Sequence, residues 1–365
     1  MTAGVNRSAV RPGLLAAVGN AVWSAEQMVE NALVGWTPNH IPDLSGKVAL
    51  VTGGNSGIGF EVCRKLVENC ATVLRVSRDR ERGEAAAQQI RADGGGLSIE
   101  VLTADLLSLD EVERLIREVK RRTKATGLHM LLANAGERGG NATPFQPGGY
   151  ASSPEGLEQT LAVDYYAHVR LVLGLLEELE RGAPARVVLQ ASQAEQFCTL
   201  DFNNLKGDKF TDSGMAPYGS SKLWKLMFGD ELQRRLRAKG GKAAQIDVFG
   251  VHPGLVDSPL MDKADMGRHL NAALIVLQNA VLGMPTWRGS LPALYALTEP
   301  RLQGAGFRYI GPNWANTNML GVRTPGNRLW RTGGPELRAR LFDGTVSVLK
   351  DVGHMPSHVP KGLVK

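Results

Sequence analysis

Residues 47–59, KVALVTGGNSGIG, constrain the fold of this chain more than any other segment. The apolar run 48–51 is typical of a strand buried on both faces, and the glycines that follow end it abruptly. Residues 60–66 then show the apolar spacing of a helix. Such a turn lets a pyrophosphate approach the backbone, where the helix N-terminus offers unpaired N–H groups and partial positive charge. The alternative for a lone motif of this size is an ordinary glycine-rich turn. We predict a nucleotide-binding loop with candidate contacts at Gly53, Asn55, Ser56, Gly57, Ile58 and Gly59.

Length and charge bound the function classes. The chain has 365 residues, 43% of them apolar, which is enough for one large core. Its formal net charge is +6, and the segment 321–365 contributes +5 of it, from eight Lys or Arg and three acids. The remainder is close to neutral, which argues against a nucleic-acid-binding face. We expect 321–365 to be a basic C-terminal tail, solvated rather than attracted to membranes. No apolar run is long enough to span a membrane.

The three cysteines, Cys63, Cys70 and Cys198, show no metal-ligand spacing, so we expect no metal site. They cannot all pair with one another, which fits an intracellular, reducing compartment, cytoplasmic or organellar. Small buried hydrophobic residues would account for them equally well.

An extension of 44 residues precedes the predicted domain. Apolar residues recur every three or four positions over 14–36, which predicts an amphipathic helix. Its polar face lacks Lys and Arg, which favours a protein partner over contact with anionic lipid, although a peripheral membrane contact stays open. Arg7, Ser8 and Arg11 precede the first acid, a weak indication of an organelle transit signal.

From residue 45 to about 320, strand and helix patterns alternate without an internal repeat. This alternation predicts an α/β fold, a single doubly wound domain whose seven-stranded parallel sheet has helices on both faces. In such a fold ligands bind at the carboxyl ends of the strands. The strands are expected near 47–52, 72–76, 98–103, 128–133, 185–191, 244–251 and 306–310, and the helices near 57–69, 80–92, 108–123, 153–181 and 216–239.

The end of the second strand indicates the cofactor. Ser77 and Arg78 stand where a carboxylate would hold a free ribose 2'-hydroxyl, and a guanidinium there suits a 2'-phosphate. We therefore expect NADP(H) rather than NAD(H), although Arg78 paired with Asp79 on the surface is an alternative. The next two strand ends add turn residues beside the cofactor's path, namely Asp105, Leu106, Asn134, Ala135 and Gly136.

Two later segments supply groups for proton transfer. Tyr218 and Lys222 lie four residues apart and share one face of a predicted helix. The ammonium favours the phenolate, as a general acid and base requires. Ser192, at the end of the fifth strand, can donate a hydrogen bond to a substrate carbonyl. A Tyr and a Lys at this spacing mean little alone, but they follow a nucleotide loop in this order.

Taken together, these motifs resemble the short-chain dehydrogenase/reductase family. TGGNSGIG at 52–59 matches the family's cofactor loop, NAG at 134–136 its fourth-strand turn, Ser192 with YGSSK at 218–222 its catalytic set, and HPGLVDS at 252–258 its PGxVxT segment. The DFNNL and FRYIGP segments are most similar to retinol-dehydrogenase-like and WW-domain-oxidoreductase-like members. The resemblance implies a Rossmann fold, NADP(H), and a small, lipophilic carbonyl or alcohol substrate.

The resemblance also implies residue roles. Tyr218 would exchange a proton with the substrate, Lys222 would bind the nicotinamide ribose, and Ser192 would orient the carbonyl. Pro253, Gly254, Val256 and Ser258 would border the nicotinamide. One departure concerns Asp164, which stands where the family generally has a relay asparagine: it can serve in the relay or draw the lysine's charge from the tyrosine.

The apolar segment 259–290 is expected to cover the substrate, or else simply to pack in the core. Two functions compete for the whole chain. The favoured one is an NADP(H)-dependent oxidoreductase, since a polar cluster without chemistry would cost stability. The alternative is a catalytically silent nucleotide-binding subunit, which the terminal additions and Asp164 favour.

Overall fold

The structure is a computed structural model of the chain. It describes residues 34–94, 98–137, 152–198, 200–210, 215–254, 256, 284–312, 319–323, 325–356 and 362–363. Most of the helix predicted over 14–36, and most of segment 259–290, lie outside these residues. The end of that helix is wrong, because Val34–Gly35 form strand β1 instead. Of the helices described, none has the length and apolar content needed to cross a membrane.

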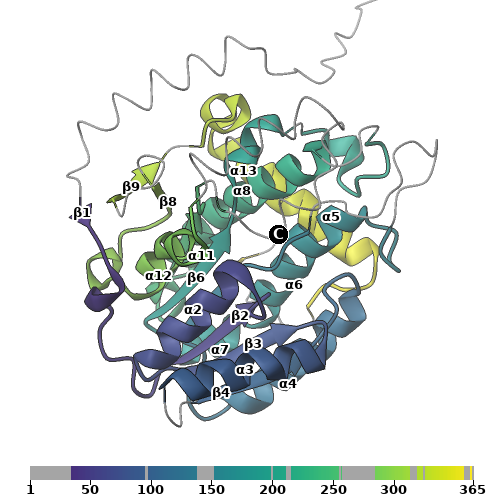
Figure 1. The fold of residues 1–365 in the computed structure, drawn as a ribbon. Helices are drawn as coiled ribbons and strands as arrows, with labels where there is room; N and C mark the ends of the chain where they lie inside the picture. Colours follow the sequence, from purple (N-terminus) through teal and green to yellow (C-terminus); the bar gives the residue numbers. More distant parts are fainter. Residues whose placement is uncertain are drawn as a thin grey trace, which may run out of the picture.

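Nine strands of the described chain form one sheet in the order β1-β9-β8-β7-β6-β5-β2-β3-β4 (Figure 1). Seven of them, from β8 to β4, are parallel, which confirms the predicted sheet. β9 runs antiparallel to both β8 and β1, so the sheet gains two strands that we did not predict. The remaining strands are β2 (Val48–Thr52), β3 (Thr72–Ser77), β4 (Ile99–Thr103), β5 (Met130–Ala133), β6 (Ala185–Gln190), β7 (Ile246–Val251), β8 (Arg308–Pro312) and β9 (Met319–Arg323).

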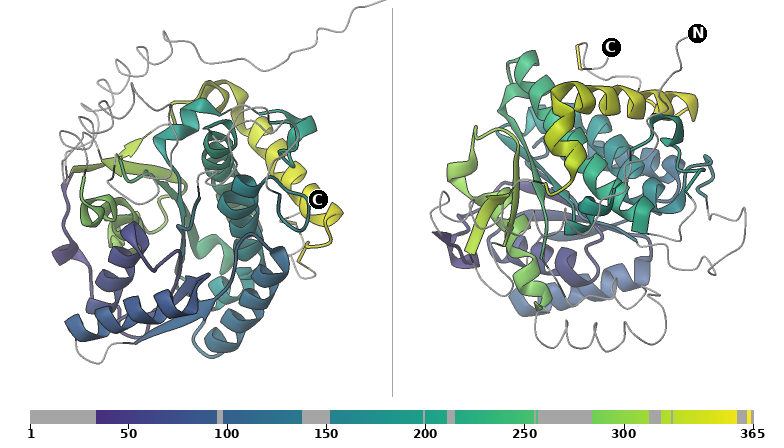
Figure 2. Two further views of the ribbon diagram at one scale, coloured as in Figure 1. Left: turned by 45° about the vertical axis from the view of Figure 1, so that its right-hand side comes forward. Right: turned by 90° about the horizontal axis from the view of Figure 1, so that it is seen from above.

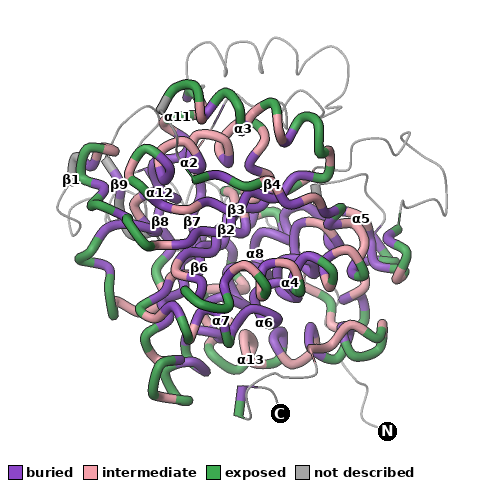
Figure 3. Tube along the Cα trace, turned by 90° about the horizontal axis from the view of Figure 1, so that it is seen from below, coloured by how far each residue is buried: buried purple, intermediate pink, exposed green. Residues whose placement is uncertain are grey.

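Helices cover both faces of the sheet (Figure 2). The central strand β2 shows why: Val48 and Leu50 enter one apolar cluster, while Ala49 and Val51 enter the other. Figure 3 shows the buried residues concentrated on the sheet and on the helix faces against it. One face carries α2 (Gly57–Glu68), α3 (Arg80–Gly94), α11 (Thr286–Gly289) and α12 (Leu291–Thr298), and the other carries α4 (Leu109–Thr123), α6 (Ala167–Gly174) and α8 (Met215–Lys239).

The order in which strands are added to the sheet reverses beside β2. The sheet grows from β2 through β3 to β4, and the chain then returns to place β5 on the opposite side of β2. A ligand crevice forms at such a switch point, outside the carboxyl ends of the strands. The ends of β2 and β5 therefore mark the expected site. Short helices complete the described chain: η1 (Pro38–His40), η3 (Gln193–Phe197), η4 (Phe202–Asn204), η5 (Ala243–Gln245) and η6 (Pro300–Leu302).

The helix predicted over 153–181 begins later and is interrupted. A turn with Gly156 at φ 78° precedes it, and the helical residues start only at α5 (Gln159–Leu161). A π-helical turn, η2 (Ala162–Tyr166), follows, and then α6 and α7 (Leu176–Arg181). Single π-helical turns are frequent at functional sites because they redirect a side chain. Here the turn carries Asp164.

The C-terminal segment is packed, so the expectation of a solvated tail is wrong. Helix α13 (Arg328–Asp351) lies against α8, with Leu341, Phe342 and Leu349 fully buried. Phe342 stacks on Phe228 of α8, with 5.1 Å between ring centroids. The basic charge that suggested solvation is partly paired, since Arg338 lies 2.8 Å from an α8 carboxylate. The apolar stripe outweighs the net charge because its burial removes several large side chains from water.

We expect Phe342→Ala to lower the free energy of unfolding by about 3–5 kcal/mol, the usual cost of truncating a buried Phe. Urea denaturation measures this change. Ser347→Ala, on the exposed face of the same helix, is the matched control and should change stability by less than about 0.5 kcal/mol. Equal, small effects of both substitutions would show that α13 does not unfold together with the rest of the domain.

Candidate active site

Hydrogen bonds at Thr52 join the carboxyl ends of β2 and β5. The Thr52 hydroxyl oxygen accepts from the backbone N–H of Asn134 at 2.9 Å and of Ala135 at 3.0 Å. The Asn134 side-chain amide donates back to the Thr52 carbonyl at 2.9 Å. Asn134 and Ala135 were predicted as cofactor contacts, and both lie beside the glycine loop. The Asn134 side chain also donates to the Gly53 carbonyl at 3.3 Å. The two strand ends are thus held at the switch point of the sheet.

Sequence reasoning did not single out His168, which joins Thr52 to the π-helical turn. Its Nδ1 lies 3.1 Å from the backbone carbonyl oxygen of Asp164, which can only accept. The proton therefore belongs on Nδ1, and Nε2 accepts from the Thr52 hydroxyl at 2.9 Å. Burial lowers the pKa of His168 far below its usual range, so the ring is neutral. Its position four residues after Asp164, on the same helical face, was the available signal.

The predicted nucleotide loop is a bare backbone cradle. Gly53 has φ 67°, and a Cβ there would lie 2.8 Å from the Ala135 Cα. A Cβ on Gly59 would lie 2.3 Å from the Gly53 carbonyl oxygen, so the helix start packs directly on the loop. Gly57 also has a positive φ, at 57°. The loop therefore requires glycine on geometric grounds, and a bare backbone at the N-terminus of a helix is suited to bind a pyrophosphate. Of the other predicted contacts, Asn55 and Ile58 are half-buried and Ser56 is exposed.

Two predicted cofactor contacts lie at the end of β3, Ser77, whose hydroxyl is hydrogen-bonded within the protein, and Arg78. The Ser77 hydroxyl is buried and donates to the Asp79 carbonyl at 2.7 Å, so it shapes the turn. Arg78 is exposed. Asp79 forms its ion pair with Arg82, at 3.4 Å, rather than with Arg78. The Arg78 guanidinium therefore stands at the strand end without an ion pair among the described residues.

The contacts predicted after β4 divide in the same way. Asp105 is exposed, and its carboxylate accepts from the backbone N–H of Leu107 at 3.0 Å. Leu106 is buried in the apolar cluster on the α4 side of the sheet. Asp105 thus stands at the carboxyl edge of the sheet, whereas the Leu106 side chain packs in the core.

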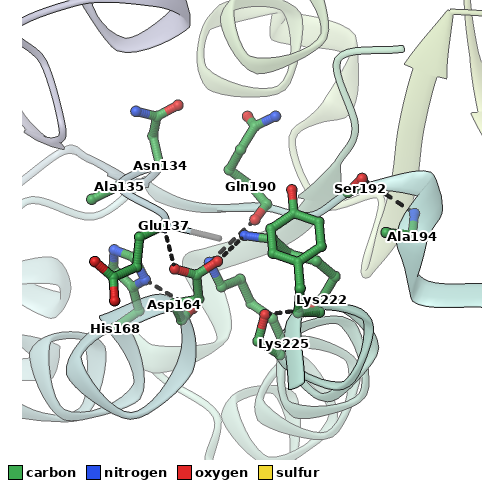
Figure 4. Close-up of polar contacts among 12 residues, drawn as sticks. Asn134, Ala135, Glu137, Asp164, His168, Gln190, Ser192, Ala194, Lys222 and Lys225 are labelled. Atoms are coloured by element: carbon green, nitrogen blue, oxygen red, sulfur yellow. Dashed lines mark hydrogen bonds and ion pairs between the residues drawn. The ribbon is translucent and has the colours of Figure 1, made fainter. Parts of the chain in front are cut away.

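A buried ion pair lies at the centre of the site (Figure 4). The Lys222 ammonium of α8 is 2.5 Å from Oδ2 of Asp164, with 4% and 0% of these side chains exposed. The same ammonium is 4.8 Å from the centroid of the Tyr218 ring. Burial disfavours the charged lysine, but the charges of Asp164 and Tyr218 outweigh it and raise the pKa of Lys222. A Cβ on Gly136 would lie 3.1 Å from Asp164 Oδ2, so the turn after β5 rests on the pair.

Ser192 is brought to the same region by helix packing. It begins η3, where its hydroxyl oxygen accepts from the Ala194 N–H at 3.2 Å. A Cβ on Gly219 would lie 2.6 Å from the Ala194 carbonyl, so α8 touches η3 one residue beyond Tyr218. The three predicted catalytic groups therefore come from elements in direct contact, and Asp164 joins them.

The same helix is also connected to the C-terminal segment. Glu195 of η3 is buried, and its carboxylate accepts from the backbone N–H groups of Gly326 at 2.6 Å and Asn327 at 3.1 Å. The Asn327 side chain caps α13 and donates to the Glu195 carbonyl at 2.8 Å. Burial raises the pKa of Glu195 to about 8, although both N–H groups oppose this shift.

Two further titratable residues adjoin the ion pair and were not predicted. The backbone N–H of Glu137 donates to Asp164 at 2.7 Å, and burial, followed by repulsion from Asp164, raises the Glu137 carboxyl pKa to about 7. Lys225 is buried and donates to the Gln190 carbonyl at 3.1 Å. Burial and then the charge of Lys222 lower the pKa of Lys225 far below its usual range. Lys225 lies three residues after Lys222, so the helical spacing that predicted Lys222 extends to it.

The loop after β7 lies beside the nucleotide loop. Residues 253–254 are half-buried, and Gly254 has φ 80°. A Cβ on Gly289 would lie 2.5 Å from the Val256 side chain and 3.4 Å from that of Ile58. Gly289 of α11 therefore packs against both Val256 of this loop and Ile58 of the nucleotide loop. Ser258, the last of the predicted set, lies outside the described residues.

Comparison with known proteins agrees with this geometry. Residues 47–268 match the family model of the short chain dehydrogenases. The chain is 34% identical to mouse retinol dehydrogenase 11 over 62% of its own length and 67% of the relative's. It is 31% identical to human WW domain-containing oxidoreductase over 73% of its own length and 62% of the relative's. The chain thus spans about two thirds of the length of these relatives.

The architecture has a counterpart among solved structures. A crystal structure of an uncharacterized protein from Mycobacterium paratuberculosis superposes with a TM-score of 0.66 at 25% identity, covering 87% of this chain and 98% of that one. The predicted doubly wound α/β fold and the family resemblance are both confirmed. The chain belongs to the short-chain dehydrogenase family of carbonyl and alcohol oxidoreductases, in the branch that contains the retinol dehydrogenases.

Proposed function

We propose that this protein is an NADP(H)-dependent oxidoreductase that interconverts a carbonyl and an alcohol on a small lipophilic molecule. One observation carries the proposal: the buried Lys222–Asp164 pair, 2.5 Å apart, lies beside the Tyr218 ring at the carboxyl edge of the sheet. A buried charge pair costs free energy unless geometry and further hydrogen bonds offset it. Its place next to a phenol and a glycine cradle gives it a chemical purpose.

The residues of the crevice fit a nicotinamide dinucleotide. The cradle at 53–59 would hold the pyrophosphate. Most of its glycines leave no room for side chains, so backbone N–H groups would face the phosphates. Arg78 would contact a 2'-phosphate, with Asp105 near the adenine. Lys222 would bind ribose hydroxyls, and residues 253–256 would border the nicotinamide. When bound, this group supplies or accepts the hydride.

The chain's own residues move and stabilise the proton. In reduction, Tyr218 donates its phenolic proton to the substrate oxygen as the carbonyl becomes an alcohol. The Lys222 ammonium, near the ring, stabilises the phenolate that remains. The Ser192 hydroxyl accepts from the Ala194 N–H, so its own hydrogen is available for the substrate oxygen. Oxidation follows the same path in reverse.

Apolar groups around the site support a lipophilic substrate. Phe197 ends the short helix that Ser192 begins, and 55% of its side chain is exposed. Trp287, in α11 beside the loop after β7, is 41% exposed. Exposed apolar side chains beside the site would suit an apolar substrate. The names of the relatives, retinol dehydrogenases, also point to a lipophilic alcohol.

We expect Tyr218→Phe to reduce turnover by about 10²–10⁴-fold, because it removes the proton donor and keeps the ring against Lys222. NADPH oxidation by the purified protein across a panel of aldehydes and ketones provides the measurement. Tyr295→Phe, on α12 and remote from the pair, is the matched control and should leave turnover unchanged. Tight NADPH binding without turnover of any compound would instead support the silent nucleotide-binding subunit.

We expect Arg78→Ala to weaken NADPH binding by roughly 10–100-fold and NADH binding by less than about 3-fold, because a charge-assisted hydrogen bond to phosphate is lost. Fluorescence titration with each cofactor measures the two affinities. Arg82→Ala, which removes the Asp79 ion pair, should leave the ratio unchanged. Equal losses for both cofactors after Arg78→Ala would contradict the assignment of this residue.

We expect Asp164→Asn to move the pH of half-maximal alcohol oxidation down by about one unit, because the Lys222 charge, which the phenolate of Tyr218 still favours, then acts on that phenolate uncompensated. Measuring kcat/KM against pH tests this shift. Asp247→Asn is a matched control, since that carboxylate is also buried and accepts from one arginine and one backbone N–H, remote from the site. It should lower stability and leave the pH profile unchanged. Identical profiles for both variants would assign Asp164 a purely structural role.

A further inference from the structure

Arg75, in strand β3, is a buried guanidinium with almost no hydrogen bonds. None of its side chain is exposed. Its Nη1 lies 3.4 Å from the Gly54 carbonyl, which is a weak contact, and Nε and Nη2 have no hydrogen-bond partner among the described residues. Buried polar groups in native proteins are almost always satisfied, and an unpaired buried cation is costly. An arginine in this state requires an explanation.

The side chain passes directly beneath the nucleotide loop. A Cβ on Gly54 would lie 2.3 Å from Cγ and 2.5 Å from Cδ of Arg75, so the loop residue lacks a side chain where the arginine passes. The Gly54 backbone N–H also donates to the β3 carbonyl of Val76, at 3.4 Å. Arg75 is two residues before Ser77, at the strand end where Arg78 follows. It is therefore buried directly beneath the loop, next to the strand end where the 2'-phosphate is proposed to bind.

The surroundings supply only a counter-charge that is shared with another cation. The charged or titratable groups that act on Arg75 are Cys63 of α2, and Glu84 and Arg91 of α3. Burial raises the pKa of the Cys63 thiol to about 12, so it is neutral. Glu84 and Arg91 lie 3.8 Å apart and pair with each other. Burial lowers the pKa of Arg75, yet an arginine stays protonated at neutral pH.

Packing alone does not account for the arginine. Its neighbours on the same face of the sheet, Val51 and Val73, belong to the apolar cluster shared with α2 and α3. A leucine or methionine would fill this strand position at lower cost. Replacement of an unneeded buried charge by an apolar residue usually stabilises a protein. The charge is therefore best explained by an anion that binds at this edge.

We propose that Arg75 is a second, buried contact for the 2'-phosphate of the cofactor, which it approaches from beneath the loop while Arg78 approaches from the solvent side. The inference rests on the NADP(H) dependence proposed above. The pyrophosphate is the other phosphate group of the cofactor, and Gly54 belongs to its proposed cradle. The pyrophosphate would bind at the α2 N-terminus, however, whereas Arg75 lies on β3, the strand whose end carries Arg78. Because none of the side chain is exposed, this contact requires the loop at Gly54 to move when the cofactor binds. The phosphate would then satisfy the two unpaired nitrogens, and the buried setting strengthens a charge-assisted bond.

The test uses Arg75→Met in the full chain, free of cofactor and with two fragments, 2',5'-ADP and 5'-ADP. The melting temperature of the free variant is expected to rise, because the unpaired charge is gone. Calorimetry should show binding of 2',5'-ADP weakened by roughly 10–100-fold and binding of 5'-ADP unchanged. Arg75→Lys should retain part of the 2',5'-ADP affinity, since an ammonium still attracts phosphate without the bidentate geometry.

Arg91→Met is the matched control, because Arg91 lies nearby but donates to the Ile99 carbonyl at 2.7 Å. It should lower the melting temperature and leave both affinities unchanged. A lower melting temperature for Arg75→Met with unchanged 2',5'-ADP binding would overturn the inference and leave the proposed function standing. Equal losses for both fragments would overturn it in favour of a pyrophosphate contact. Failure of the unsubstituted protein to bind 2',5'-ADP would overturn the NADP(H) assignment itself.

Discussion

The ion pair between Lys222 and Asp164 is the interaction on which the rest of the site depends. It joins α8 to the π-helical turn, and through the Glu137 N–H it also fixes the chain after β5. Such a pair adds little net stability compared with apolar residues, but removing one partner costs about 3–5 kcal/mol. A side chain at Gly136 would press on both members of the pair, 3.1 Å from Asp164 Oδ2 and 3.3 Å from Lys222 Nζ. Asp164 therefore holds three segments in place as well as balancing a charge.

The sequence predicted the seven parallel strands well, because strands buried on both faces appear as apolar runs between glycine turns. It missed β1 and β9, since β1 has only two residues and β9 has five with a glycine at its centre. It also misjudged α13. The buried Leu341, Phe342 and Leu349 have helical spacing, but Gly334 and Pro335 break the helix pattern before them, and the net charge suggested solvent.

The site was predictable where spacing carries the information. Tyr218 and Lys222 are one helical turn apart, and the glycines of the loop fall within seven residues, 53–59. Burial was not predictable, and it decides the state of the other groups. Lys225 and Arg75 appear as ordinary basic residues in the sequence, yet both side chains are almost fully removed from water. The role of Asp164 emerged only from the resemblance to a family with asparagine there. Its distance from Lys222 required coordinates.

The contact between Glu195 and residues 326–327 couples the middle of the chain to its C-terminal helix. The helix that presents Ser192 is anchored by the first residues of the C-terminal helix, through three hydrogen bonds. Removal of the C-terminal helix would leave the Glu195 carboxylate without these two backbone donors. The C-terminal segment therefore helps to hold the short helix that Ser192 caps. A ligand that displaces it would alter the position of a hydroxyl many residues away.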